Sequence, residues 1–122
     1  MPEVPALTLT TVQRAGLSVV DLDGVLDLST VPVLEAELER LAGEGRSVVL
    51  DLRRVEFMDS TGLAVILRFS ARAKDGPFDL VVVRGPRAVH RVFEMTRTDA
   101  MLQMLDVGEL GDLGAGARPA AD

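Results

Sequence analysis

The residues of this chain with the clearest chemical potential are the four consecutive small or polar residues Asp59-Ser60-Thr61-Gly62. They lie between two largely apolar runs, 47–52 and 63–67, so the sequence predicts a buried strand, a tight polar turn and a buried helix. This order places hydroxyl groups at a helix N-terminus, where free backbone N–H groups and the helix dipole favour negative charge. A hydroxyl in that position can act as a helix cap, as a nucleophile or as the acceptor of a phosphoryl group.

The motifs that would make Ser60 a catalytic residue are missing. No Gly-x-Ser-x-Gly surrounds it, and the single histidine, His90, lies on another predicted helix with no required spacing to it. No Gly-rich phosphate-binding motif occurs, and the only lysine, Lys74, is far from the turn in the sequence. We therefore expect no catalytic residues and a protein that is not an enzyme.

Metal and cofactor sites have no better support. The absence of cysteine excludes disulfides, thiolate chemistry and cysteine-based metal sites, and one histidine gives no zinc-binding spacing. Asp21, Asp23 and Asp27 cluster, but the rest of a calcium-binding loop is missing, so we expect solvated loop acids. The sequence predicts no metal and no cofactor.

Composition and charge restrict the kind of partner. At 122 residues the chain is long enough for one domain with a real core. This core must be built from Val, Leu, Ala, Ile and a few Phe and Met, because aromatics make up only 3%. The net charge of −6 argues against a direct nucleic-acid partner. No signal peptide and no membrane-spanning run is evident, so we expect a cytoplasmic protein with no membrane partner.

Alternating strand and helix patterns must position the turn. We expect strands over 7–12, 17–22, 46–52 and 79–84, and helices between 30 and 43, from 63 to 74 and after Gly85-Pro86. Residues 100–105 fit either a short strand or a helix. The predicted fold is α/β, a mixed β-sheet of about four to six strands with an N-terminal hairpin and about three to four helices packed on it.

The sequence also suggests where the domain ends. Residues 1–106 are expected to form the domain, and the Gly/Ala-rich residues 107–122 a flexible C-terminal tail.

The polar turn and its flanks resemble a known family. The segment 57–63, Phe-Met-Asp-Ser-Thr-Gly-Leu, and the following Val65-Ile66-Leu67 closely resemble the phosphorylation-site segment of STAS-domain anti-sigma factor antagonists. Residues 23–27 with Thr30 match the family's Gly-x-Leu-Asp…Thr pattern. Residues 89–95 resemble its Val-x-x-Leu-Phe-x-Met helix, with Val92 at the position of the leucine. The resemblance covers about residues 7–105 and implies a STAS-like mixed sheet. The family usually ends in a helix, which the glycines in 106–116 predict to be short or absent here.

The resemblance implies a phospho-switched binding module. Ser60 would be phosphorylated by an anti-sigma factor with serine kinase activity, and a metal-dependent serine phosphatase would restore it. The dephosphorylated protein would sequester the anti-sigma factor and so free a sigma factor for transcription. The resemblance also implies that loop 26–29 lies near Ser60, so the expected partner-binding residues are Asp27, Leu28, Ser29, Asp59, Ser60, Thr61 and Gly62.

A second interpretation remains open from the residues alone. In it the chain is a STAS adaptor subunit of a membrane transport or sensory assembly, and Ser60 is only a helix cap.

Overall fold

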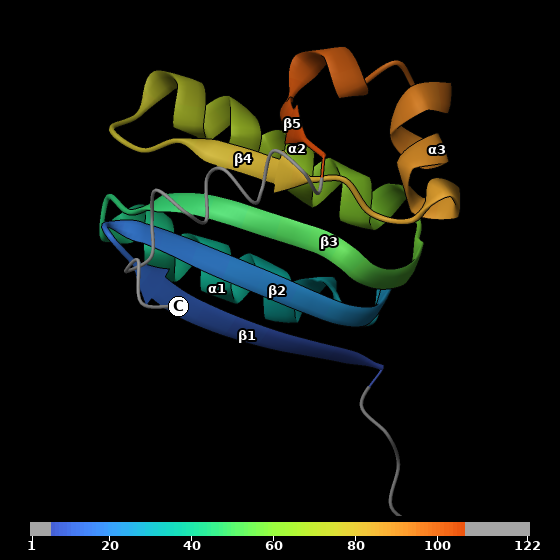
Figure 1. Ribbon diagram of the computed structural model, residues 1–122, viewed down its shortest axis with the longest axis horizontal. Helices are drawn as coiled ribbons and strands as arrows, with labels where there is room; N and C mark the ends of the chain where they lie inside the picture. Colours follow the sequence, from blue (N-terminus) through green and yellow to red (C-terminus); the bar gives the residue numbers. More distant parts are fainter. Residues whose placement is uncertain (1–5, 107–122) are drawn as a thin grey trace, which may run out of the picture.

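The computed structural model describes residues 6–106, in which strands and helices alternate after an N-terminal hairpin (Figure 1). The hairpin consists of β1 and β2, and the following elements run from α1 to β5. Their bounds are β1 Leu7–Arg14, β2 Leu17–Leu26, α1 Val31–Gly43, β3 Ser47–Met58, α2 Ser60–Asp75, β4 Leu80–Val83, α3 Arg87–Met95, the 3-10 turn η1 Asp99–Met101 and β5 Gln103–Leu105.

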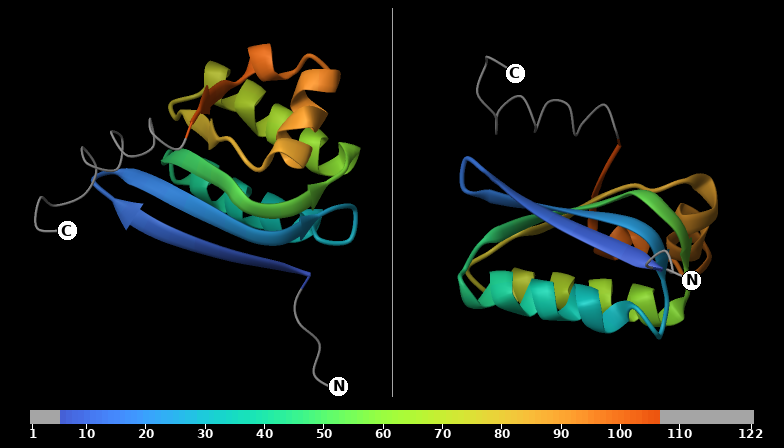
Figure 2. Two further views of the ribbon diagram at one scale, coloured as in Figure 1. Left: turned by 45° about the vertical axis from the view of Figure 1, so that its right-hand side comes forward. Right: turned by 90° about the horizontal axis from the view of Figure 1, so that it is seen from below.

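The strands form one five-stranded sheet in the order β1-β2-β3-β4-β5. Strands β1 and β2 are antiparallel, and every later pair is parallel. Each crossover steps to the next strand in the same direction, which brings α1 and α2 to one face of the sheet (Figure 2). The predicted α/β class, the mixed sheet and the N-terminal hairpin are confirmed.

Strand β3 is the centre of the sheet and leads directly into the polar turn. Its residues Val48 to Leu52 are all buried, which confirms the expectation of a strand covered on both faces. Leu22, Leu50 and Ile66 are completely buried in the core between sheet and helices. The parallel strands β2 and β3 both end at the edge where α2 begins, so the sequence after each strand meets there.

The structure extends two strands beyond their predicted ends. Strand β2 continues to Leu26 and β3 to Met58, through two register shifts in their pairing. At one shift Gly24 has a φ of 122°, and a Cβ there would lie 2.2 Å from the Ala6 carbonyl oxygen. Bulges interrupt the alternation of side chains by which strands are recognised in a sequence. For this reason the sequence left a turn or a bulge open at Asp23-Gly24, and the extension of β3 to Met58 was missed.

The acids expected in a solvated loop have different positions. Asp21 and Asp23 lie in β2 and face Arg54 of β3. The Nη1 atom of Arg54 is 3.7 Å from Oδ2 of Asp21 and 3.9 Å from Oδ2 of Asp23. Only Asp27 lies in a loop, so the interpretation of all three as loop acids was wrong.

The C-terminal part contains both alternatives that the sequence left open. Residues 99–101 form the 3-10 turn η1 and residues 103–105 the short strand β5. The expected flexible tail at 107–122 and the short or absent terminal helix lie outside the described residues. No helix within residues 6–106 is long and apolar enough to cross a membrane.

Candidate functional site

Asp59 connects β3 to α2 and caps the helix. Its backbone is extended, with φ −102° and ψ −174°, and its carboxylate accepts hydrogen bonds from the N–H groups of Thr61 (2.9 Å) and Gly62 (3.1 Å). These are two of the four N–H groups that an α-helix leaves without a partner at its start. The sequence left the cap to Asp59 or Ser60, and the structure assigns it to Asp59. The interpretation of Ser60 as the cap was therefore wrong.

The two hydroxyl groups of the turn have different surroundings. The Thr61 hydroxyl donates to the Asp59 carboxylate, and its residue is only half-exposed. Ser60 is the first residue of α2 and is exposed, and its hydroxyl has no hydrogen-bond partner within residues 6–106. Of the two hydroxyls, only that of Ser60 is available to a reagent from solvent.

Loop 26–29 lies beside this turn, as the resemblance implied. The Leu26 carbonyl oxygen accepts from the Asp59 N–H at 3.2 Å. Within the loop, Asp27 Oδ1 accepts from the N–H and the hydroxyl of Ser29, at 3.0 and 2.7 Å. The structure therefore brings Asp27, Ser29 and the turn to one edge of the sheet, whereas their role in partner binding remains a prediction.

The buried side chain of Thr30 holds loop 26–29 in shape through hydrogen bonds to the backbone. Its buried hydroxyl donates to the Val25 carbonyl oxygen at 2.8 Å and accepts from the Asp27 N–H at 3.0 Å. The residue precedes α1, but its side chain makes no capping bond to that helix. Its contribution is to hold the loop against the end of β2.

The carboxylates of Asp27 and Asp59 are both ionised at the edge of the sheet that carries Ser60. The Thr61 hydroxyl, together with the donating N–H groups, lowers the pKa of Asp59. The Ser29 hydroxyl likewise lowers the pKa of Asp27, although the neighbouring charge of Asp59 opposes this shift. Both groups are therefore negatively charged at neutral pH.

Two exposed apolar side chains lie at or just beyond the ends of β2 and β3. Leu28 is 73% exposed in the loop, and Phe57 is 54% exposed near the end of β3. Leu28 belongs to the predicted partner surface, whereas Phe57 was not among its predicted residues. The strand period was the available signal, because the inward position of Met58 requires Phe57 to point to the opposite face.

Gly62 permits the first turn of α2 to pack on the ends of the two strands. A Cβ at this position would lie 2.9 Å from Cγ of Leu26 and 2.9 Å from Cγ of Met58. The residue itself is buried. Any contribution of Gly62 to the surface is therefore made through packing, by letting Asp59 and Ser60 sit close to loop 26–29.

Metal-binding and acid–base groups are scarce in the described part of the chain. Residues 6–106 contain no cluster of three or more His, Asp or Glu side chains that could hold a metal ion. His90 lies on α3, where its Nε2 is 3.8 Å from the Glu94 carboxylate and its ring contacts Phe93.

Comparison with known proteins gives a consistent set of relatives. A family model described as "Mlab, STAS domain" matches residues 6–110. BtrV of Bordetella bronchiseptica, described as an anti-sigma factor antagonist, is 34% identical over 82 residues, which span 66% of this chain and 71% of BtrV. The anti-sigma-B factor antagonist of Staphylococcus aureus is 32% identical over 78 residues, 63% of this chain and 72% of that protein. The crystal structure of an anti-sigma factor antagonist from Mycobacterium paratuberculosis superposes with a TM-score of 0.74 at 26% identity, covering 80% of this chain and 84% of that one.

Proposed function

Because this chain belongs to the STAS-domain family and resembles several anti-sigma factor antagonists, we propose that it is a cytoplasmic anti-sigma factor antagonist switched by phosphorylation of Ser60. In this proposal the chain is a binding module and not an enzyme. The partner is an anti-sigma factor with serine kinase activity, which supplies the ATP chemistry. The dephosphorylated chain sequesters that anti-sigma factor and frees a sigma factor, and a metal-dependent serine phosphatase restores this form.

The observation that carries the proposal is the unequal state of the two hydroxyls. A kinase acceptor must be reachable and must not be held in another hydrogen bond. Ser60 meets both conditions, whereas the hydroxyl of Thr61 is bonded to Asp59. Since Asp59 carries the cap, Ser60 can be modified without removing the hydrogen bonds that begin α2.

The same geometry supports a switch that acts on binding and leaves the fold intact. A phosphate on Ser60 adds about −1.5 to −2 charges at pH 7. The helix dipole favours a negative charge at the start of α2, so the fold should tolerate the phosphate. On the surface, however, the charge joins the carboxylates of Asp27 and Asp59, and burying three anionic groups under a partner is unfavourable. A difference of about 1.4 kcal/mol suffices for a tenfold loss of affinity.

The surface also indicates the chemistry of its partner. The exposed side chains of Leu28 and Phe57 provide apolar area, and the Asp27 carboxylate provides a fixed negative charge. A complementary anti-sigma factor would present an apolar patch next to cationic side chains.

Phosphorylation can be tested directly on the full chain. Phosphopeptides of the protein isolated from its own cells are mapped in several growth conditions, and wild type, Ser60→Ala and Ser29→Ala are used to capture partners from the same lysate. The captured kinase is then incubated with each variant and ATP. We expect phosphate on wild type and Ser29→Ala but not on Ser60→Ala, and stronger capture by the unmodified chain.

Ser29→Ala is the matched control because it removes the other exposed serine of the same surface. Phosphate on Ser29 in place of Ser60 would contradict the assigned acceptor. An unmodified Ser60 in every condition, with only membrane-assembly components recovered, would overturn the proposal in favour of an adaptor subunit.

A further inference from the structure

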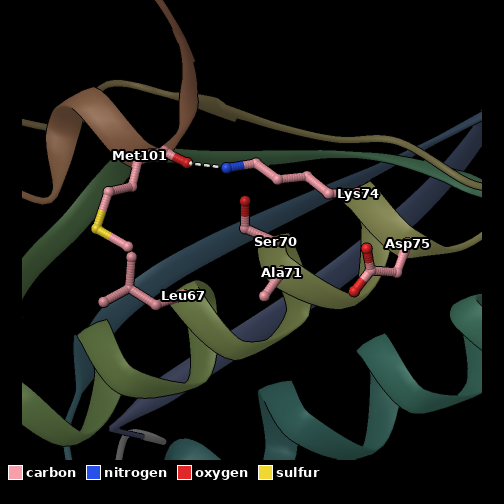
Figure 3. A pocket seen from close by; sticks show the side chains of 6 residues that line it. All are labelled: Leu67, Ser70, Ala71, Lys74, Asp75 and Met101. Carbon is pink, nitrogen blue, oxygen red and sulfur yellow. Dashed lines mark hydrogen bonds between the residues drawn. The ribbon is translucent and has the colours of Figure 1, made fainter.

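A cavity of about 190 Å³ lies between the C-terminal half of α2 and the turn η1 (Figure 3). It is about 15 Å along the helix from Ser60, since ten residues of α2 separate Ser60 from Ser70. The proposed switch makes no use of this cavity. Its lining residues are Leu67, Ser70, Ala71, Lys74, Asp75 and Met101.

The hydroxyl of Ser70 points into the cavity and has no hydrogen-bond partner among residues 6–106 (Figure 3). The residue is only 5% exposed. A hydroxyl at the end of a helix can bond to the carbonyl four residues earlier, as that of Thr96 does to Val92 at 2.7 Å. Ser70 makes no such bond, so its hydroxyl keeps a free donor at the wall of the cavity. The hydroxyl is therefore available to donate a hydrogen bond to a guest molecule in the cavity.

Two opposite charges lie at the rim of the cavity. The Lys74 ammonium donates to the Met101 carbonyl oxygen at 2.9 Å, which leaves two of its three N–H donors for a guest. It forms no ion pair with a carboxylate of the described residues. The Asp75 carboxylate lies on the other side of Ser70 (Figure 3). The cavity thus has the Lys74 ammonium and the Ser70 hydroxyl close together, and the Asp75 carboxylate lies apart from both.

The volume of the cavity and the residues of its wall restrict which molecule can bind in it. At the liquid volume of water, about 190 Å³ holds roughly six water molecules. This is well below the roughly 300–1,000 Å³ of pockets that enclose drug-sized ligands. Leu67, Ala71 and Met101 make the remaining wall apolar. The guest is therefore small, with an aliphatic part and charged ends.

We propose that this cavity binds a small zwitterion with a short aliphatic side chain, of the class of the free aliphatic α-amino acids. The carboxylate of the guest accepts from the Lys74 ammonium and the Ser70 hydroxyl. Its ammonium group faces Asp75, and its side chain packs against Leu67, Ala71 and Met101. The proposal does not depend on the phosphorylation of Ser60.

The binding can be measured by amide NMR titration of the full chain with L-leucine at millimolar concentrations. Two analogues are titrated in parallel, 4-methylpentanoate, which lacks the ammonium group, and 3-methylbutylamine, which lacks the carboxylate. We expect saturable shifts of the amides in 67–75 and 99–101 with leucine. Each analogue should bind at least about tenfold more weakly, the loss expected when a contact to a charged group disappears.

Variants connect the binding to its residues. Ser70→Ala and Lys74→Gln should each weaken leucine binding about tenfold, whereas Arg91→Gln removes an exposed cation of α3 and should change nothing. Ser70→Ala should melt at the same or a higher temperature, since it removes a hydroxyl that makes no hydrogen bond within residues 6–106. A lower melting temperature would assign the hydroxyl to the fold. That result, the absence of saturable shifts, or equal binding of either analogue would overturn the proposal.

Discussion

Replacing Asp59 tests the central feature of the site, which is that this carboxylate and not the Ser60 hydroxyl begins α2. Asp59→Ala removes the acceptor of two backbone N–H groups and of the Thr61 hydroxyl. Loss of a helix cap costs about 0.5–2 kcal/mol, and loss of the negative charge at the helix start adds about 0.3–1 kcal/mol. We expect Asp59→Ala to lower the free energy of unfolding by about 1–3 kcal/mol. The melting temperature should fall by roughly 5 °C per kcal/mol.

Asp59→Asn separates the hydrogen bonds from the charge. The asparagine side chain retains an oxygen that can accept from the N–H groups, so only the charge contribution of about 0.3–1 kcal/mol should be lost at pH 7. The pH dependence has a defined sign. The folded state lowers the pKa of Asp59 below its ordinary value of 3.8. The charge therefore stabilises the fold fully above that value, and this contribution disappears as the pH falls through the lower pKa of the folded state.

Urea unfolding of wild type and both variants at pH 7, 5 and about 3 measures these differences. The gap between wild type and Asp59→Asn should be constant from pH 7 to 5 and should shrink below pH 4, as Asp59 becomes protonated. Asp75→Asn, in the last turn of the same helix, is the matched control, since removing a negative charge there should be neutral or stabilising. Two results would refute the assignment of Asp59 as the cap of α2. One is that Asp59→Ala is as stable as wild type. The other is that the difference in stability between wild type and Asp59→Asn does not change with pH.

Three further substitutions test the packing and the surface around the turn. Gly62→Ala should lower the free energy of unfolding by about 1–2 kcal/mol, because the new Cβ collides with two core side chains and this cost exceeds the gain in helix propensity. The control is Gly43→Ala, whose Cβ meets nothing within 4 Å. It should be neutral or stabilising in the same urea assay. Thr30→Val should cost about 1–3 kcal/mol, since it leaves a buried carbonyl and an N–H without their hydroxyl partner, and an unchanged urea midpoint would contradict this. Phe57→Ala should leave stability nearly unchanged but weaken binding of the captured anti-sigma factor about tenfold or more in calorimetry, whereas Val12→Ala, at the other end of the sheet, should bind normally.

Much of the fold could be predicted because its signals are local. Buried parallel strands appear as nearly unbroken apolar runs, such as 48–52, and the helices between them show apolar residues at helical spacing. The missing pieces depend on contacts distant in sequence. The extension of β2 to Leu26 requires a bulge with Gly24 in a left-handed conformation next to Ala6. The pair Asp23-Gly24 indicates a turn or a bulge, but nothing within the strand itself decides between the two.

The candidate site was predicted less completely than the fold. The residues of the turn were identified, but their division of roles was not, because aspartate and serine are nearly equal as N-caps. The backbone decides between them, since Asp59 is extended and Ser60 already belongs to α2. Phe57 was missed because an apolar residue near the end of a buried strand looks like core until the register of that strand is known.

The order Asp-Ser-Thr in the turn has a consequence for regulation. If Ser60 capped α2, its phosphorylation would change the start of that helix and with it the packing on β3. Because Asp59 holds the N–H groups of Thr61 and Gly62 and also the hydroxyl of Thr61, the helix start is complete without Ser60. A charge placed on Ser60 is then felt mainly at the surface formed with loop 26–29. In the proposed switch, this separation would let phosphorylation of Ser60 change what the domain binds at little cost to its stability, which is the property that a reversible antagonist requires.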